Sequence, residues 1–243
     1  MSRSASQNPG LTRRSLIGAA AAGLASVALA GCSNTTPRRP AVVPPPALPR
    51  PGPGFGSYVT MYGPVFDEGF PIPAVPIDKM DPRLLRQVVR DPTGERPGTI
   101  VVDTSAHYLY LTLGNGEAMR YGVGLGRAGF EWSGRAVVEW KQPWPRWFPP
   151  AEMIARQPEL AEYSEANGGM APGLTNPLGA RALYIFQNGK DTLYRIHGSP
   201  EWNSIGRSVS SGCVRLINQD IIDLYDRVPD KAPVLVTGGV GII

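Results

Sequence analysis

The chain has 243 residues, which is enough for one domain or two small ones. Its apolar content of 42% and charged content of 18% are typical of a globular domain, while 29 Gly and 26 Pro indicate many turns and loops. The net charge of +4 is modest, and no basic stripe alternates with aromatic residues, which argues against a nucleic-acid partner.

Residues 1–32 have the composition of an export signal and are left out of the fold prediction. Residues 12–17 (TRRSLI) resemble a twin-arginine signal, and the Ala-rich apolar run that follows is too short to span a membrane comfortably. The run ends in residues 29–32 (LAGC), which resemble a bacterial lipobox that would leave Cys32 as a lipidated N-terminus. The alternative is cleavage nearby without a lipid. Either route predicts a periplasmic protein, and the lipobox predicts a membrane-anchored lipoprotein.

Two segments separate the signal from the main domain. Residues 33–56 are rich in proline with little apolar bulk, so we expect an extended polyproline II linker. Residues 57–96 are expected to form an N-terminal extension that packs on the following domain. Within it, Asp81 as N-cap and Pro82 at the first helical position predict a short helix that reaches Val89.

The main domain is expected over residues 97–237, followed by a tail at 238–243. Period-two alternation predicts strands at residues 99–103, 108–113, 118–125, 183–186, 192–196 and 233–237. The first three form a β-meander. His107 is expected to be exposed at its first turn and to have no catalytic role. The glycine string 124–129 resembles a dinucleotide-binding pattern, but turn and strand sequence follows instead of a helix, so we expect a loop.

Two short helices are expected. One covers 151–156; the other runs from Gln219 to about Arg227, with Asn218 as N-cap and apolar residues at helical spacing. The irregular segment 157–181 is typical of a lid. Before it, the aromatic loop listed here could be a substrate platform or could cover the core: Trp140, Trp144, Trp147 and Phe148. The elements together predict a mostly β fold, a sandwich or barrel with one or two short helices.

Cys213 is the single thiol of the exported domain once Cys32 is assigned to the signal, and it follows His197. An imidazole can form or stabilise the reactive thiolate at neutral pH. The hydroxyl of Ser210, the bare backbone of Gly212 and the charge of Arg215 suit a nucleophile better than a core. The alternative is that Cys213 is a small buried hydrophobe.

Other cysteine chemistries fit less well. One His and one Cys without clustered carboxylates fall short of the three ligands that a catalytic zinc needs, so neither metal nor cofactor is predicted. A papain-like protease is disfavoured because its Cys precedes its His along the chain. Cys213 also has no partner for a disulfide within the domain.

His197-Gly198 followed by residues 210–216 (SSGCVRL) resembles the active-site signature of the L,D-transpeptidase catalytic domain (YkuD-type) family. Residues 98–103 and 176–184 resemble supporting segments of that family, and the likeness covers roughly residues 97–237. Many members carry a second His where this chain has Ser211, so no auxiliary role for such an imidazole is carried over.

The resemblance implies a fold and a mechanism. Cys213 would attack the peptide bond after the diamino acid of a peptidoglycan tetrapeptide, and His197 would act as base, oriented by a backbone carbonyl near Gly198. The loop residues Ser210, Ser211 and Gly212 would support the sulfur, with the backbone N–H groups of Gly212 and Cys213 as oxyanion donors. The candidate substrate-binding residues are Arg215, Trp147 and Tyr194; Arg215 could instead brace the loop.

The implied partners are peptidoglycan stem peptides and the product of the first step is a thioester. The acyl group would pass to an amine of another stem or of an outer-membrane protein. Water as acceptor would make the protein a carboxypeptidase or hydrolase of the same bonds. A further alternative is a non-catalytic lipoprotein that binds the wall.

Overall fold

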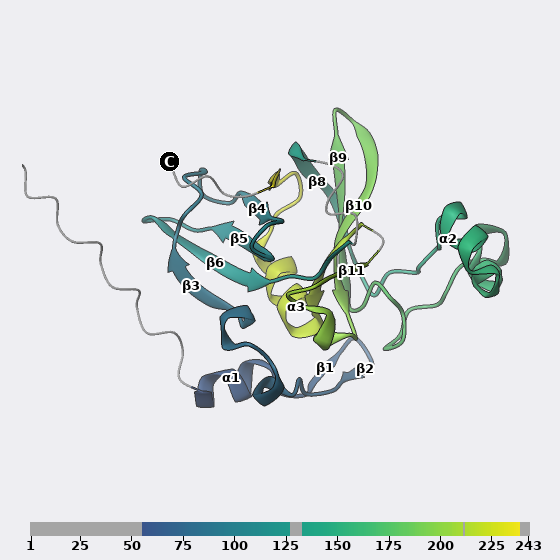
Figure 1. Cartoon of the computed structure of the whole chain (residues 1–243), viewed down its shortest axis with the longest axis horizontal. Helices are drawn as coiled ribbons and strands as arrows, with labels where there is room; N and C mark the ends of the chain where they lie inside the picture. Colours follow the sequence, from purple (N-terminus) through teal and green to yellow (C-terminus); the bar gives the residue numbers. More distant parts are fainter. Residues whose placement is uncertain (1–54, 127–132, 211, 239–243) are drawn as a thin grey trace, which may run out of the picture. The chain divides into compact units, whose positions relative to one another are not determined.

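The structure is a computed structural model that describes residues 55–126, 133–210 and 212–238. Cys32, the predicted signal segment, nearly all of the predicted linker and Ser211 lie outside the described residues. The described part is mostly β, as predicted, with one sheet of nine strands and two sheets of two strands (Figure 1). None of its helices is both long and apolar enough to cross a membrane.

The nine-stranded sheet has the order β12-β10-β9-β8-β13-β4-β5-β6-β3. In chain order its strands are β3 (Gln87–Arg90), β4 (Ile100–Asp103), β5 (Tyr108–Thr112), β6 (Glu117–Gly122), β8 (Gly134–Pro143), β9 (Arg181–Gln187), β10 (Lys190–Ser199), β12 (Val214–Ile217) and β13 (Pro233–Thr237). The small sheets pair β1 (Val65–Asp67) with β2 (Phe70–Ile72), and β7 (Leu125–Gly126) with β11 (Ser208–Ser210).

The described helices are short. The α-helices are α1 (Phe55–Met61), α2 (Ala151–Arg156) and α3 (Asn218–Arg227). The 3₁₀ helices are η1 (Ile77–Lys79), η2 (Pro82–Leu84), η3 (Pro158–Tyr163), η4 (Glu165–Asn167) and η5 (Trp202–Ser204). Helix α2 covers the predicted residues, and η3 and η4 lie in the segment predicted as an irregular lid.

The predicted meander is confirmed, and the strands predicted at 183–186 and 192–196 pair as a hairpin. Strands β4, β5 and β6 pair antiparallel in succession, because short turns return the chain at each end. Strands β9 and β10 form an antiparallel hairpin around Asn188 and Gly189, whose φ values are 51° and 74°. Two left-handed residues in succession match the twist of the flanking strands, which explains the Asn-Gly pair.

Two predicted helix boundaries were wrong. Beyond η2 the chain enters β3 and pairs with β6, because the β-branched residues Val88 and Val89 fit a sheet edge better than an isolated helix. Asp81 is nevertheless the N-cap of η2 and accepts the N–H of Arg83 at 2.9 Å. Asn218 is not the cap of α3 but its first residue; the cap is Ile217.

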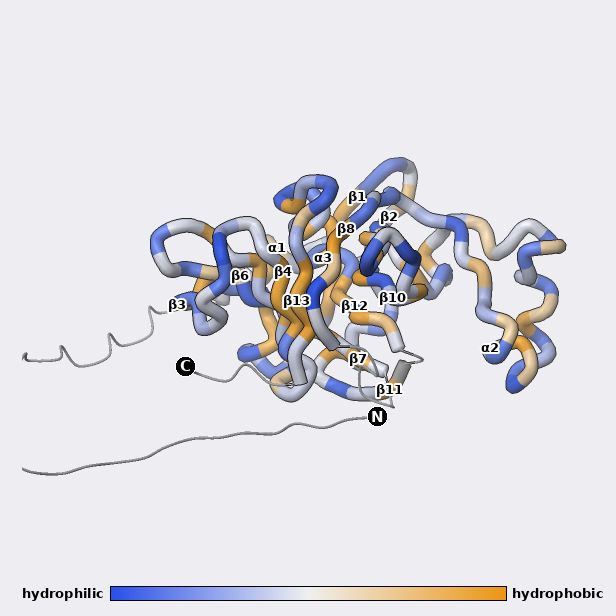
Figure 2. Tube along the Cα trace, turned by 90° about the horizontal axis from the view of Figure 1, so that it is seen from above, coloured by the Kyte–Doolittle hydropathy of each residue, from blue (hydrophilic) through white to orange (hydrophobic). Residues whose placement is uncertain are grey.

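The main core lies between the sheet and α3. It contains Ile196 of β10, Val214 and Leu216 of β12, and Ile221 and Leu224 of α3, each at most 1% exposed. Figure 2 shows further apolar residues along β4 and β13, in the middle of the sheet. Because one face of β10 and β12 is buried in this core, the alternate side chains of both strands point to the opposite face of the sheet.

The N-terminal extension covers a second cluster. Tyr62, Ile77 and Leu85 are buried together with Ile205 and Ile217. The Tyr62 hydroxyl donates to Asp220 of α3 at 3.1 Å and accepts the Arg86 N–H at 2.6 Å. The extension is therefore tied to α3 and to the end of β12 by both apolar and polar contacts.

Candidate active site

The edge pair β10 and β12 brings two distant segments side by side. The strands run parallel with Ile196 opposite Val214 and His197 opposite Arg215. Side chains alternate between the two faces of a strand. Because Ile196 and Val214 point into the main core, His197 and Arg215 point to the other face. Arg195 directly precedes Ile196, and Cys213 directly precedes Val214.

His197 is buried, with 5% of its surface exposed. Its Nδ1 lies 2.6 Å from the carbonyl oxygen of Gly198, so Nδ1 carries the hydrogen and Nε2 keeps a lone pair. Burial lowers the pKa of His197 to about 4; the hydrogen bond to Gly198 opposes this shift, and the charges of Arg215 and Arg195 add to it. The imidazole is therefore neutral at pH 7.

Cys213 is partly exposed and is not in a disulfide. Burial raises the pKa of the Cys213 thiol, while a hydrogen bond from the Arg195 backbone and the charges of Arg195 and Arg215 act in the opposite direction. The same two guanidinium groups act on His197, which places the sulfur and the imidazole in one electrostatic environment. Both shifts favour the uncharged form of the group, a neutral thiol at Cys213 and a neutral imidazole at His197.

Two glycines hold the backbone around this pair. Gly212 has φ +129°, and a Cβ there would lie 3.1 Å from Cε1 of Tyr194. A Cβ on Gly198 would lie 2.4 Å from Oδ1 of Asn218, so α3 can approach β10 only where the side chain is missing. Close packing explains why both positions are glycine, and the left-handed backbone at Gly212 is a second reason there.

Arg215 is buried at 8% exposure and has spare donors. Its Nη1 lies 3.3 Å from Oε2 of Glu201, whereas Nε and Nη2 have no hydrogen-bond partner among the described residues. Burial lowers its pKa, and the carboxylate of Glu201, together with the ionisable thiol of Cys213, opposes the shift. Both of these nitrogens are shielded from solvent as well as unpaired.

Comparison with known proteins decides the family. The family model of the L,D-transpeptidase catalytic domain (YkuD) matches residues 97–236. The chain belongs to this family.

Curated relatives agree with this assignment. The chain is 36% identical over 141 residues to the probable L,D-transpeptidase ErfK/SrfK of Salmonella typhimurium, covering 57% of this chain and 43% of the relative. It is 34% identical over 137 residues to the probable L,D-transpeptidase YbiS of Escherichia coli, covering 54% and 42%. The matches thus span less than half the length of these relatives.

A solved structure is also similar in sequence. It is described as a probable carnitine operon oxidoreductase from Brucella melitensis and is 47% identical, covering 63% of this chain and 94% of that one, with a TM-score of 0.45. At a TM-score below 0.5, this likeness says nothing about what the present chain does.

Of the L,D-transpeptidase signature, His197 and Gly198 lie on β10 and residues 214–216 lie on β12. Tyr194 packs its ring against Gly212, and Gly198 accepts the hydrogen bond from His197. Ser210 ends β11, where its backbone pairs with Gly126. Ser211 lies outside the described residues, so its predicted supporting role is untested.

The aromatic loop splits into separate sites. Trp140 lies within β8 and stacks on Tyr184 with ring centroids 3.5 Å apart. Trp144 is buried and donates to Asp67 at 2.8 Å, so it covers a core. Trp147 pairs through its backbone with Met170 at the base of the segment that carries α2. The predicted substrate role of Trp147 stays a prediction.

The sequence interpretation missed Arg195 and Glu201. Arg195 pairs with Asp191 at 2.7 Å and lies 4.4 Å from the Tyr184 ring centroid. Its place two residues before His197 on a strand was the available signal, because alternate residues share a face.

His107 bonds through Nε2 to the Ser208 hydroxyl at 3.0 Å. Within the described ranges, no three His, Cys, Asp or Glu side chains gather where a metal ion could bind.

Proposed function

We propose that the protein is a peptidoglycan L,D-transpeptidase with Cys213 as nucleophile and His197 as general base. The observation that carries the proposal is the neutral imidazole, fixed at Nδ1 by the Gly198 carbonyl and open at Nε2, in the same electrostatic environment as the single described thiol. Membership of the L,D-transpeptidase family supplies the substrate class.

The first half-reaction forms a thioester. Cys213 Sγ attacks the carbonyl carbon of the peptide bond after the diamino acid of a tetrapeptide stem, and Nε2 of His197 takes the thiol proton. Because burial disfavours a separated thiolate, the proton leaves as the C–S bond forms. The C–N bond then breaks, the imidazolium returns the proton to the leaving amine, and D-alanine departs.

The groups around the sulfur stabilise this step. The backbone N–H groups of Gly212 and Cys213 are the proposed oxyanion donors, since the missing side chain of Gly212 lets a peptide carbonyl approach. The positive charge of Arg215, opposite His197 on the edge pair, supports a role in holding a substrate carboxylate. Tyr194 shapes the approach by packing on Gly212.

The second half-reaction transfers the acyl group. An acceptor amine attacks the thioester carbonyl carbon and gives its proton to His197. The C–S bond then breaks, the imidazolium returns the proton to the Cys213 sulfur, and an amide joins the two partners. The acceptor is an amine of another stem or of an outer-membrane protein. Water in its place would give an L,D-carboxypeptidase.

The proposed location rests on the N-terminal sequence. The twin-arginine-like residues 12–17 support export, and the lipobox-like residues 29–32 support lipidation at Cys32. A periplasmic lipoprotein would hold the domain near its peptidoglycan substrate through the Pro-rich linker.

The test is product analysis with a purified tetrapeptide. Mass spectrometry of wild type and of Cys213→Ala separates the candidates. A transpeptidase releases D-alanine and forms cross-linked dimers, a carboxypeptidase or hydrolase gives only shortened peptides, and a wall-binding lipoprotein leaves the tetrapeptide intact. Cross-linking by Cys213→Ala would contradict the proposal.

A further inference from the structure

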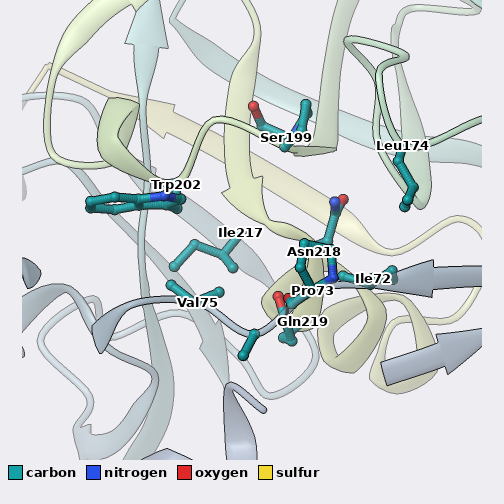
Figure 3. A pocket seen from close by; sticks show the side chains of 11 residues that line it. Ile72, Pro73, Val75, Leu174, Ser199, Trp202, Ile217, Asn218 and Gln219 are labelled. Carbon is teal, nitrogen blue, oxygen red and sulfur yellow. Dashed lines mark hydrogen bonds between the residues drawn. The ribbon is translucent and has the colours of Figure 1, made fainter. Parts of the chain in front are cut away.

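A small pocket lies at the end of the strand face that carries His197 and Arg215. It has a volume of about 120 Å³, and Ser199 and Ile217, the next pair on that face, line it. Figure 3 shows its other wall, formed by Ile72, Pro73 and Val75 of the N-terminal extension. This wall precedes residues 97–236, so it lies outside the family domain.

Two buried amides line the pocket with half of their hydrogen-bonding groups unused. Asn218 accepts the Ala180 N–H through Oδ1 at 3.0 Å, which fixes the orientation of its amide. Gln219 donates through Nε2 to the carbonyls of Gly63 and Pro73 at 3.1 and 2.9 Å. Nδ2 of Asn218 and Oε1 of Gln219 have no partner within the described part of the chain. Asn218 is 6% exposed and Gln219 is 5% exposed, so water reaches them mainly through the pocket.

These groups define the chemistry of a ligand. A spare donor beside a spare acceptor matches the C=O and N–H of a peptide group. The surrounding side chains are mainly apolar, among them Leu174 and Trp202, and none of the residues that line the pocket is charged. Ligand pockets usually measure about 300–1,000 Å³, so this one has room for a single small residue. The fitting ligand is an uncharged peptide unit with a small apolar side chain.

The position of the pocket indicates in which half-reaction its ligand takes part. At about 3.3 Å per residue along a strand, Ser199 lies roughly 7 Å from His197, on the side away from Cys213. The acceptor amine must reach the thioester and give its proton to the imidazole, so the acceptor lies against His197. A residue attached near that amine can extend into the pocket.

We propose that this pocket binds an uncharged, alanine-sized residue of the acyl acceptor, with Asn218 and Gln219 holding its peptide group. The inference rests on the proposed function and adds an acceptor subsite whose outer wall is the N-terminal extension. Acceptors with a charged or bulky group at that position are excluded.

Binding of a neutral probe tests the subsite without any chemistry. N-acetylalanine methylamide, as either enantiomer, is titrated into the full chain while the Trp202 indole is followed by NMR, with Trp202→Phe to assign its signal. Two variants alter the pocket. Asn218→Asp keeps the oxygen that accepts from Ala180 but loses the donor. Ala74→Leu adds bulk from an exposed position that lines the pocket.

The expected result is a saturable shift of the Trp202 signal with at least about a tenfold higher Kd in both variants. The matched control is Ala161→Leu, an equal change at an exposed alanine that does not line the pocket. Equal Kd values in all proteins, or no shift at Trp202, would overturn the subsite. In turnover assays the two pocket variants raise the KM of an alanine-containing acceptor more than they lower kcat. A wild type that binds the probe but forms no thioester would contradict the proposed function and leave the subsite standing.

Discussion

Nδ1 of His197 lies 2.6 Å from the carbonyl oxygen of the next residue, Gly198. A backbone carbonyl can only accept, so this contact fixes the hydrogen on Nδ1 and directs the free lone pair of Nε2 away from the bond. In many catalytic groupings a carboxylate orients the base. A neutral carbonyl orients the ring without stabilising its charged form as strongly, which is consistent with the low pKa of His197.

The pH dependence of thioester formation follows from that low pKa. His197 must be neutral to accept the thiol proton, and burial lowers its pKa to about 4. We expect the rate to stay constant from pH 7 to about pH 5 and to fall only as the pH approaches 4. His197→Gln should lower the rate about 10²–10⁴-fold. A half-maximal rate near pH 6.5, the value of a free imidazole, would contradict the buried neutral base.

Alkylation reports on the thiol separately from turnover. Burial raises the pKa of Cys213, so iodoacetamide should modify it slowly at pH 7. The rate should rise with pH through a midpoint above that of a free thiol, about 8.5. Mass analysis of the peptide that contains Cys213 measures the modification directly. A midpoint below pH 7 would indicate a preformed thiolate instead.

Two substitutions distinguish the two alternative roles of Arg215, binding a substrate carboxylate and bracing the loop. If Arg215 holds a substrate carboxylate, Arg215→Gln removes a charge-assisted bond worth about 1.5–3 kcal/mol and raises the tetrapeptide KM about 10- to 150-fold. Arg215→Lys keeps the charge without the fork and should fall between. Arg156→Gln, on exposed α2, is the matched control. A lower Tm with an unchanged KM would support the alternative that Arg215 braces the loop.

Three glycine substitutions test the backbone around the site by thermal unfolding. Gly198→Ala places a methyl group 2.4 Å from Oδ1 of Asn218 and should cost about 3 kcal/mol or more. Gly212→Ala forces a left-handed residue against Tyr194 and should cost about 1–3 kcal/mol. Gly114→Ala has open space and serves as control, with a change within about 0.5 kcal/mol. Equal Tm values for all three would refute the packing argument.

Asp220 couples the N-terminal extension to pH. Burial raises its pKa to about 7, with Arg86 and the Tyr62 hydroxyl opposing the shift. The native state therefore binds its proton more tightly than the unfolded state. The resulting stability is fully present below the unfolded pKa of about 4 and is lost as the pH rises through 7.

Asp220→Asn removes this titration. The difference in free energy of unfolding between variant and wild type should change by on the order of 1–3 kcal/mol between pH 4 and pH 8, in the direction of a relatively more stable variant at high pH. Urea denaturation at several pH values measures it. A difference that does not vary with pH would show that Asp220 is ionised as in an exposed residue.

Local patterns predicted the parts of the fold that depend on neighbouring residues. The β9–β10 hairpin follows from alternation and Asn188-Gly189, and His197 falls on β10 as expected from the residues before it. Strand β3 could not be predicted in this way, because its stability comes from pairing with β6 about thirty residues later.

The same limit explains what the sequence left open at the site. Asn is a residue type common at helix N-caps, but Oδ1 of Asn218 accepts the N–H of Ala180 instead. The sequence alone does not show that Ala180 lies next to Asn218. The burial of Arg215 depends on the loop that brings Glu201 over it. The pocket needs residues from the extension, from β10 and from α3 at once.

The decisive measurement is the intact mass of the protein during incubation with a tetrapeptide stem. We expect a transient mass increase equal to the tripeptide acyl group, located by digestion on the peptide that contains Cys213, with release of one D-alanine per acylated chain. The adduct should be absent in Cys213→Ala and should form at least about a hundredfold more slowly in His197→Gln. Release of D-alanine by Cys213→Ala, or an adduct on another residue, would contradict cysteine catalysis at this site.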